Sequence, residues 1–510
     1  MLATAQATAL VGLDAHIVLV EVKSTRGPAE FTLVGLAEAS VRESRVRVRS
    51  ALHRLGVDLG EYVITVTLVP ADLKKTGGSF DLAIATATLA ALGQVPADGL
   101  DSTVLLGELS LTGTLRPVRG VLPQLMGARR AGVRHVIVPA ANGPEAAEAD
   151  GIEVFAADSL EQVRDHLQGK QTLPTACAAP YAPEHAPGAD LSEIKGQYAA
   201  RRALEIAAAG AHHILMIGPP GSGKTMLARR LSTILPPLTH EEALAVSVIH
   251  SVAGILDPAC GLVRQRPFRA PHHTVSDAGL VGGGDPPRPG EISLAHLGVL
   301  FLDELAEFRR SALEALRQPM DDGVVTIARG HVRATFPARP LVVAAVNRCP
   351  CGYAGDPSGR CRCGPDRVRA YRARLSGPFL DRIDLHVQLP PVEVASLRHE
   401  AAGESSASVR EQVMRARDAQ RERALRGEVS VLVNALLSLR DIDRVASPDE
   451  AGGRILAGAV ETHGFSHGRV LRIARTIADL DGSDGVRACH VAEAISLRLW
   501  DTFGSRQRSA

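Results

Sequence analysis

The sequence is poor in aromatic residues and has almost no net charge. Aromatic residues make up 3% of the 510 positions, with a single Trp, and the formal net charge is +1. The hydrophobic cores must therefore be built mainly from Ala, Val, Leu and Ile. Because no basic field surrounds the whole chain, any contact with nucleic acid has to come from local clusters of arginine.

Long apolar runs and a basic N-terminal segment are also missing. No stretch approaches the length of about 18 apolar residues that a membrane-spanning helix needs, so no such helix and no membrane partner are expected. Asp14, His16 and Glu21 interrupt the apolar runs near the N-terminus. Strands, rather than a signal peptide, are predicted there.

The cysteine pattern argues against a secreted protein held by disulfides. There are seven cysteines, an odd number, and four of them lie between Cys349 and Cys363. A disulfide framework needs pairs distributed over the fold and an oxidising compartment. We therefore expect a reduced, cytoplasmic location.

The length and the shifts in composition predict three domains and a linker, since the chain is too long for one core. Residues 1–168 alternate strand-like with helix-like segments. Strands are expected at Ile17–Val22, Tyr62–Leu68, Val104–Leu106 and His135–Val138, and helices at Phe80–Leu92 and Val121–Ala131. Residues 169–189 hold four prolines and no apolar periodicity, which indicates a linker. A second domain is expected at 190–391 and a helical C-terminal domain at 392–510.

A phosphate-binding loop follows a short apolar strand. Ile214–Ile217 precedes GPPGSGKT, and a helical segment follows, which is the context that this motif requires. Its glycines let backbone N–H groups and the helix N-terminus point at phosphates. Lys224 is expected to reach the β- and γ-phosphates, and the Thr225 hydroxyl to bind Mg²⁺. The predicted ATP-binding residues of the loop are Gly218, Pro219, Pro220, Gly221, Ser222, Gly223, Lys224 and Thr225.

Two carboxylates follow a second apolar strand. Gly298–Leu305 reads GVLFLDEL, which predicts a buried parallel strand with Asp303 and Glu304 at its carboxyl end. Asp303 is expected to hold Mg²⁺ through water. Glu304 is expected to orient or deprotonate the attacking water, which makes it the first catalytic candidate.

Two further polar residues are candidates for the same reaction. A third strand is predicted at Leu341–Val346, and Asn347 at its end is either a turn residue or a sensor of the γ-phosphate. Arg382 has acidic neighbours in Asp381 and Asp384. It is expected either to form a salt bridge with them or to enter the ATP site of a neighbouring subunit as an arginine finger.

Cys349, Cys351, Cys361 and Cys363 form a C-x-C-x9-C-x-C pattern. Four thiolates on one short loop could bind a tetrahedral Zn²⁺ ion, and the alternative is a loop of free thiols. The three other cysteines carry no such pattern. His272 and His273 could also be metal ligands, although a polar insert loop is the preferred interpretation.

Four segments together resemble the YifB/ComM group of Mg-chelatase-like AAA+ ATPases, over nearly the whole chain. They are DLSEIKGQYAARRALEIAAAGAHHILMIGPPGSGKT (Asp190–Thr225), RPFRAPHHTVSDAGLVGGGDPPRPGEISLAHLGVLFLDEL (Arg266–Leu305), NRCPCGY (Asn347–Tyr353) and RVLRIARTIADLDG (Arg469–Gly482). The resemblance implies an α/β fold, with an AAA+ P-loop core of a parallel sheet covered by helices on both faces, and a C-terminal helical lid. It also implies an insert within 269–296 and a hairpin within 323–336.

The same resemblance implies how the ATP site is completed. Members form rings, so the resemblance implies a homo-oligomer of six subunits, with Arg382 acting as the finger in a neighbouring subunit. Gln197 is counted among the nucleotide-binding residues. Relatives often carry a Ser-x-Arg before the last matched segment, and this chain does not. Arg469, with Arg472 behind it, is therefore the predicted sensor-2 arginine.

The N-terminal region resembles another family, the proteolytic domain of Lon, an α+β fold of the ribosomal S5 type. The matching segments are Lys75–Ala87 and Gly107–Glu145. Ser79 falls near the place of Lon's nucleophile, but Leu122 stands where the lysine base would be. A serine without its base is a weak nucleophile, so peptidase activity is not expected and a scaffold or DNA-binding role is favoured.

Arginine clusters give three candidate DNA contacts. They are Arg329, His331 and Arg333 on the expected hairpin, Arg367, Arg369, Arg372 and Arg374 on a helix, and Arg410, Arg415, Arg417, Arg421, Arg423 and Arg426 on a mixed-charge helix. The last group is interpreted mainly as a solvated face. Arg329 and Arg333 are the predicted contacts, because in ring helicases of this branch the hairpin points into the pore.

Three classes of function compete after these observations. The first is a DNA-dependent motor that remodels single-stranded or branched DNA, a branch-migration helicase or translocase of the ComM type. The second is a chelatase-like ATPase subunit acting on a protein partner or in metal insertion. The third is an ATP-dependent protease, which Leu122 disfavours. An intact Glu304 argues for turnover rather than for an ATP-binding switch.

Overall fold

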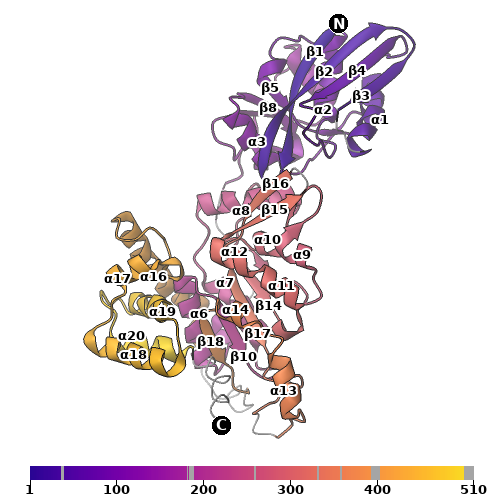
Figure 1. Cartoon of the computed structure of the whole chain (residues 1–510). Helices are drawn as coiled ribbons and strands as arrows, with labels where there is room; N and C mark the ends of the chain where they lie inside the picture. The colour runs from indigo at the N-terminus through magenta and orange to yellow at the C-terminus, as the bar shows by residue number, and fades with distance from the viewer. Residues whose placement is uncertain are drawn as a thin grey trace.

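The computed structural model describes residues 1–35, 39–180, 182, 189–257, 260–329, 332–355, 359–391 and 403–498. Three parts follow one another along the chain (Figure 1). An N-terminal α/β domain lies at one end, an ATPase-type α/β domain lies in the middle, and a helical domain packs on the side of the second. No helix in the described ranges is long and apolar enough to cross a membrane.

The N-terminal domain is built on a seven-stranded mixed sheet in the order β3-β4-β2-β1-β5-β8-β9. The strands are β1 (Leu2–Val11), β2 (Asp14–Arg26), β3 (Glu30–Val34), β4 (Tyr62–Val69), β5 (Thr103–Leu105), β8 (His135–Pro139) and β9 (Glu153–Ala157), with a small hairpin of β6 (Glu108–Leu109) and β7 (Leu115–Arg116). The helices are α1 (Ala39–Arg54), α2 (Asp81–Ala91), α3 (Val121–Arg130), α4 (Gly143–Ala146) and α5 (Leu160–Leu167). The strands and helices expected in this region from the sequence are all present.

Alternate residues of the strands face two separate cores. In β8, Ile137 packs in the cluster that contains α2, whereas Val136 and Val138 pack with α3. This alternation follows from the two-residue period of a strand. The first part of the expected linker continues this domain, because Ala176 N–H donates to Val154 O at 2.8 Å along β9.

The ATPase domain contains five parallel strands in the order β11-β14-β17-β10-β18. They are β10 (Ile214–Ile217), β11 (Phe268–Arg269), β14 (Val299–Leu302), β17 (Leu341–Val346) and β18 (Leu385–Gln388). The helices are α6 (Tyr198–Gly210), α7 (Lys224–Ile234), α8 (His240–Ala253), α11 (Arg310–Ala315), α12 (Arg317–Asp322), α13 (Pro365–Arg372) and α14 (Gly377–Leu380). Strand β10 lies between β17 and β18, so the loop after β10 leaves the carboxyl edge of the sheet beside the end of β17.

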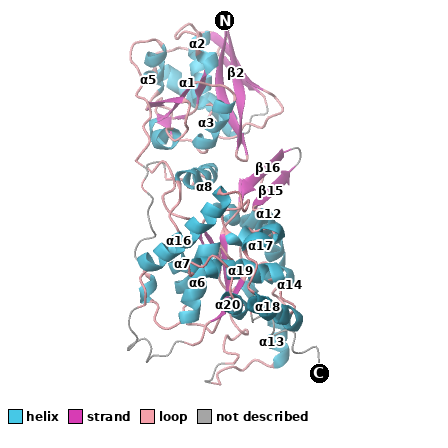
Figure 2. Cartoon of the chain, turned by 90° about the vertical axis from the view of Figure 1, so that its left-hand side faces the viewer, coloured by secondary structure: helices cyan, strands magenta, loops and turns pink. Residues whose placement is uncertain are grey.

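Both insertions predicted in this domain are present. The first contains α9 (Asp277–Val281), β12 (Gly282–Gly283), β13 (Arg288–Pro289) and α10 (Glu291–Leu294). The second is a hairpin of β15 (Val324–Arg329) and β16 (Val332–Pro337) that projects toward the turn between β1 and β2 (Figure 2). Gly12, in the turn between β1 and β2, lies so close to the hairpin that an added Cβ would be 2.6 Å from the Cβ of Ala334.

The N-terminal domain and the ATPase domain share a hydrophobic cluster. Leu122 and Leu125 of α3 pack with Ala243 and Val246 of α8. The buried carboxylate of Glu145 joins the two sides, because it accepts hydrogen bonds from Leu122 N–H (3.0 Å) and from the Ser251 hydroxyl of α8. Burial raises the pKa of Glu145.

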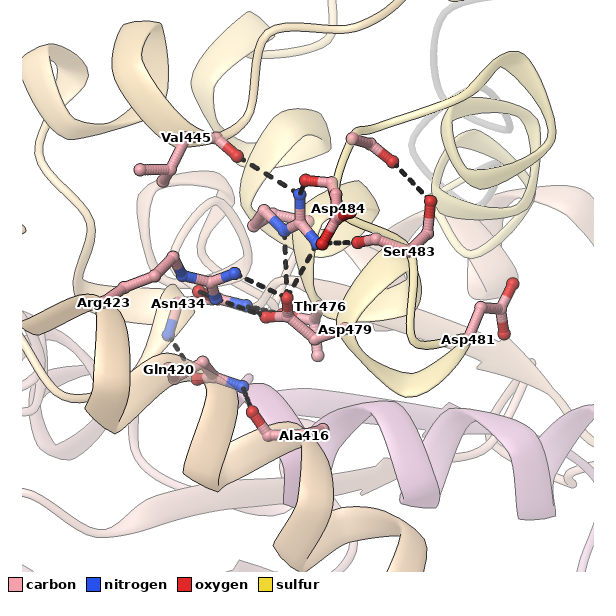
Figure 3. Close-up of polar contacts among 12 residues, drawn as sticks. Ala416, Gln420, Arg423, Asn434, Val445, Thr476, Asp479, Asp481, Ser483 and Asp484 are labelled. Atoms are coloured by element: carbon pink, nitrogen blue, oxygen red, sulfur yellow. Dashed lines mark hydrogen bonds and ion pairs between the residues drawn. The ribbon is translucent and has the colours of Figure 1, made fainter. Parts of the chain in front are cut away.

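The C-terminal domain consists of α16 (Ser406–Leu425), α17 (Leu439–Val445), α18 (Glu450–His463), α19 (His467–Leu480) and α20 (Ala488–Ser496). Its interior holds a polar network (Figure 3). Asp479 accepts from Arg423 Nη1 at 2.7 Å, from Arg475 Nη2 at 2.8 Å and from Asn434 Nδ2 at 2.7 Å. Because each carboxylate oxygen has partners, the buried charge is paired with two guanidinium groups instead of being left isolated.

Candidate nucleotide site

The phosphate loop is held by a lysine that bonds to the loop itself and to the next strand. Lys224 Nζ donates to Gly218 O and Pro219 O, both at 2.9 Å, and to Asn347 Oδ1 at 3.1 Å. Burial lowers the pKa of Lys224, while Asp303 and Glu304 oppose that shift. Asn347 thus faces the lysine, as the sensor hypothesis requires, because β17 neighbours β10 in the sheet.

The two predicted Mg²⁺ residues meet across the site. Thr225 Oγ1 donates to Asp303 Oδ2 at 2.9 Å, although the residues are far apart in sequence. Asp303 follows β14, Asn347 follows β17 and the loop follows β10, so three parallel strands deliver their side chains to one edge. A hydroxyl and a carboxylate are the oxygen ligands that Mg²⁺ takes in nucleotide sites.

The loop and its neighbours fit a phosphorylated ligand. Gly221 has a left-handed backbone (φ 78°), and a Cβ added there would meet no atom within 4 Å, so the loop borders open space. Ser222 Oγ and Gln197 Oε1 are buried without a hydrogen-bond partner among the described residues. Gln197 Nε2 donates to Pro390 O at 3.0 Å, which places this predicted residue beside the loop. Buried polar atoms of this kind are normally satisfied, so a ligand is their natural partner.

Glu304 has a companion that the sequence analysis did not assign. It adopts a left-handed backbone conformation (φ 52°), and its Oε2 lies 3.5 Å from Nδ1 of His273 in the insert. The ring of His272 packs on that of His273 with centroids 4.1 Å apart. The only signal in the sequence was the His pair itself, and nothing in the spacing tied it to Glu304.

Arg382 forms an ion pair, but with a different partner from those considered. Its Nε donates to Asp321 Oδ2 of α12 at 2.8 Å, and its Nη1 donates to Pro378 O at 2.7 Å. Asp384 instead binds the buried ring of His212 at 3.1 Å. Among the described residues, no hydrogen bond or ion pair joins Arg382 to the phosphate loop of its own chain.

Among the described residues, no hydrogen bond or ion pair joins Arg469 to the phosphate loop. Burial lowers the pKa of His213, and the positive charge of nearby Arg469 lowers it further. His213 directly precedes β10, whereas the phosphate loop follows it. Arg472 Nε donates to Leu437 O at 2.8 Å within the helical domain. The sensor-2 role of Arg469, with Arg472 behind it, therefore stays a prediction.

The four clustered cysteines converge in space. The Sγ atoms of Cys349, Cys351, Cys361 and Cys363 all lie within 4.8 Å of one another. The backbone N–H of Tyr353 is the leading cause that lowers the pKa of the Cys351 thiol to about 6. The structure thus brings together the four residues that the spacing singled out.

The arginine clusters differ in how many of their members are already paired. The side chains of Arg329 and Arg333 are exposed, and neither side chain has a hydrogen bond or ion pair to another described residue. His331, at the tip, lies outside the described residues. On α13 and after it, Arg369 pairs with Asp366 and Arg374 pairs with Glu307 at 3.0 Å. The hairpin arginines are therefore the better available for a ligand.

The mixed-charge helix α16 is only partly a solvated face. Arg417 Nη2 donates to Ala208 O at 2.7 Å, and burial lowers the pKa of Arg417 to about 9. Arg410 Nη1 donates to Thr233 O at 2.9 Å, and Arg423 binds Asp479. These arginines fasten the helical domain to the ATPase domain or hold its interior together.

The remains of a protease site in the N-terminal domain are not assembled. Leu122 has no exposed surface and belongs to the cluster shared with α8. Lys75 is buried and donates to Pro70 O, not to Ser79. The hydroxyl of Ser79 has no bond to another described residue. The domain therefore offers Ser79 no base.

Comparisons with known proteins agree with this division. Residues 190–397 match "Magnesium chelatase, subunit ChlI", residues 403–498 match its C-terminal domain, and residues 20–142 match "Subunit ChlI of Mg-chelatase". YifB of Salmonella typhimurium is 43% identical over 506 residues, covering 98% of this chain and 97% of the relative. The chain belongs to the YifB/ComM family of Mg-chelatase-like AAA+ proteins.

Two other relatives match this YifB/ComM family member, one over nearly the whole chain and one over part of it. The competence protein ComM of Haemophilus influenzae is 42% identical over 510 residues, covering 98% of this chain and 97% of ComM. Lon protease 2 of Bacillus subtilis is 28% identical over 148 residues, or 28% of this chain and 26% of that protease. The predicted family, the AAA+ core, the Lon-like N-terminal region and the helical C-terminal region are thus confirmed.

Proposed function

We propose that this protein is a ring-forming ATPase that couples ATP hydrolysis to the movement or remodelling of single-stranded or branched DNA. The observation that carries the proposal is the coexistence of an assembled nucleotide site with two exposed, unpaired arginines on a hairpin of the same domain. A motor needs both a site of turnover and a contact that the turnover can move.

Each residue of the site has a distinct task in this proposal. ATP with Mg²⁺, when bound, supplies the phosphoanhydride whose hydrolysis releases the free energy. Lys224 and the loop N–H groups bind phosphate oxygens, and Thr225 and Asp303 hold the metal. Glu304 orients or deprotonates water, and Asn347 positions Lys224 through their 3.1 Å bond.

A ring, for which we propose six subunits, explains the residues that do not reach the site in their own chain. Arg382 and Arg469 both carry positive charge that this chain does not direct at its own phosphate loop. We assign them to the ATP site of neighbouring subunits. Arg382 is held ready by Asp321, an exposed ion pair that costs little to break.

DNA contact is supported by two surfaces. The first is the pair Arg329 and Arg333, in the part of the hairpin that extends beyond the buried Phe336 and Val325. The second is an open hollow of about 870 Å³ on the N-terminal domain, lined by Arg45, Arg49, His53 and Arg54 of α1. Arginines spaced along a helix or a hairpin bind phosphates without reading sequence.

The test is the ATPase rate with no DNA, single-stranded DNA, duplex and a four-way junction. We expect DNA to stimulate the wild-type protein and Glu304→Gln to remove turnover while retaining nucleotide binding. The double variant Arg329→Ala/Arg333→Ala should keep the basal rate and lose the stimulation. Arg415→Ala, an exposed arginine of α16, is the matched control.

A different outcome would favour a chelatase-like ATPase acting on a protein partner, in line with the magnesium-chelatase match. An active ATPase that no DNA form stimulates would overturn the DNA motor and leave this second candidate. The variant Arg382→Ala tests the arginine finger separately. If it binds nucleotide and keeps its ring, as size-exclusion chromatography with light scattering would show, but does not hydrolyse ATP, the result would support a role of Arg382 in the ATP site of a neighbouring subunit.

A further inference from the structure

Four thiols lie close together in the loop that follows β17 and Asn347. The Sγ of Cys349 lies 3.3 Å from that of Cys351 and 3.8 Å from that of Cys361, and Cys351 and Cys361 are 3.6 Å apart. A disulfide requires about 2.05 Å between sulfurs, so these are separate thiols. Four ligands at the usual Zn–S distance of about 2.3 Å stand about 3.8 Å apart in a tetrahedron. The observed spacing matches such a set.

The loop that carries these thiols has little else to order it. Between β17 and α13, the described residues form no helix or strand. Cys349 nevertheless has no exposed surface. Ordering an irregular loop costs about 1–2 kcal/mol per residue in conformational entropy, and metal ligation is a common way to offset that cost.

We propose that Cys349, Cys351, Cys361 and Cys363 bind one structural Zn²⁺ ion and that the metal-bound loop holds the phosphate loop and Asn347 in place. The second half of this proposal comes from what the cysteine loop touches. Gly352 directly follows Cys351 in a tight turn, in which its N–H donates to Cys349 O at 2.9 Å. A Cβ added to Gly352 would be 2.3 Å from Cδ of Pro220 in the phosphate loop.

The other end of the loop reaches the sensor residue. Helix α13 begins at Pro365, directly after Cys363 and its neighbour Gly364. Its buried Tyr371 packs in the same hydrophobic cluster as Val346, the residue that directly precedes Asn347. The cysteine loop is thus fixed at both ends to the nucleotide site, at Pro220 and at Asn347.

This inference rests on the ATP-binding half of the proposed function and is independent of the DNA half. Gly352 and Tyr371 are positioning residues, since they act through Pro220 and Asn347 and do not touch the phosphates. Loss of the ion should release Pro220 and Asn347 together. Nucleotide affinity should fall even though Lys224, Thr225 and Asp303 are unchanged.

The first experiment measures zinc and nucleotide binding in the full-length protein without DNA. Elemental analysis should find about one zinc per chain. In Cys361→Ser, we expect zinc to be lost and the Kd of a fluorescent ATP analogue to rise at least about tenfold. Cys489→Ser removes an exposed cysteine far along the chain and should change neither value.

A second variant keeps the ligands and breaks only the contact. Gly352→Ala should retain zinc, because all four thiols remain, but weaken binding of the ATP analogue because the new Cβ displaces Pro220. Wild-type protein stripped with a chelator should behave like Cys361→Ser and recover when zinc alone is added back.

Three results would overturn the proposal. They are wild-type protein without zinc, iron in place of zinc, or zinc-free protein that binds the ATP analogue as tightly as the zinc-bound form. Unchanged nucleotide affinity in a zinc-containing Gly352→Ala protein would overturn the role of the loop. None of these results depends on whether DNA stimulates the ATPase.

Discussion

In the ATPase domain, Lys224, Thr225, Asp303 and Asn347 meet beside the open backbone of Gly221, whereas in the N-terminal domain Leu122 fills the place where a lysine base would stand. Both regions resemble enzyme families, but only in the ATPase domain do the site residues contact one another. The difference lies in what surrounds the polar groups. In the ATPase domain the polar side chains bond to each other beside open space, whereas in the N-terminal domain an apolar interface occupies the corresponding place.

The largest effect is expected at the assembled site. Lys224→Ala should lower the ATPase rate at least about 100-fold, because the charge that stabilises the phosphates in the transition state is removed. Phosphate release measures the rate. The control is Lys170→Ala, which changes an exposed lysine outside the cores of both domains. Retention of more than a tenth of the activity would contradict the assignment.

Restoring the missing lysine should harm the protein and not revive a protease. Leu122→Lys places an unpaired charge in the cluster with Ala243 and Val246, which should cost roughly 3 kcal/mol of stability. Leu122→Met, similar in volume, should cost less than about 1.5 kcal/mol. Thermal unfolding measures both, and a casein-release assay checks for peptidase activity. Cleavage of casein by Leu122→Lys would mean that this single substitution is sufficient to give the N-terminal domain peptidase activity.

A smaller effect on catalysis is expected from the residue beside Glu304. His273→Ala should lower kcat about tenfold with little change in KM, because it removes a contact that orients Glu304 and none that binds phosphate. His272→Ala, which leaves the Glu304 contact intact, is the matched comparison. Equal losses in the two variants would show that the pair acts only through packing.

The stability of the interface between α3 and α8, where Glu145 is buried, should depend on pH. Burial raises the pKa of Glu145 in the folded state. The stability that its protonated form contributes is complete below the unfolded pKa and is lost as pH rises through the folded pKa. Glu145→Gln should therefore become more stable relative to wild type as pH is raised from 5 to 8, as urea unfolding at several pH values would show. A constant difference would argue against a buried, protonated Glu145.

The smallest effect belongs to the serine that remains from the Lon-like pattern. Ser79→Ala should leave the ATPase rate unchanged. It should change the free energy of unfolding by no more than about 0.5 kcal/mol. Phosphate-release and urea-unfolding measurements on the same preparations check this. A large loss of activity would indicate a role for Ser79 that the absence of a base does not explain.

The parts of the site that the sequence predicts well are those written in contiguous motifs. Lys224, Thr225, Asp303 and Asn347 each follow a short apolar strand, and parallel strands necessarily bring their carboxyl ends to one edge. The hairpin within 323–336 and the insert within 269–296 are implied by the family resemblance. Local pattern and family resemblance were sufficient there.

What the sequence could not reveal depends on packing between distant segments. Arg382 pairs with Asp321 and not with its neighbours in sequence, because α12 lies against the turn before β18. Arg469 lies near the amino end of β10 because α19 packs on α6. The contact of His273 with Glu304 and the burial of Leu122 against α8 have the same origin. No periodicity in the chain encodes such pairings.

One hydrophobic core runs without interruption from the ATPase sheet into the helical domain. Met216 and Val343 of the sheet belong to the same cluster as Val413, Leu456 and Ile473 of the helices. A hinge between these two parts would have to open that core to water, at about 25 cal/mol for each Å² of apolar surface exposed. In the ring that we propose, movement after ATP hydrolysis is therefore expected as rotation of whole subunits against one another, at the interfaces between them.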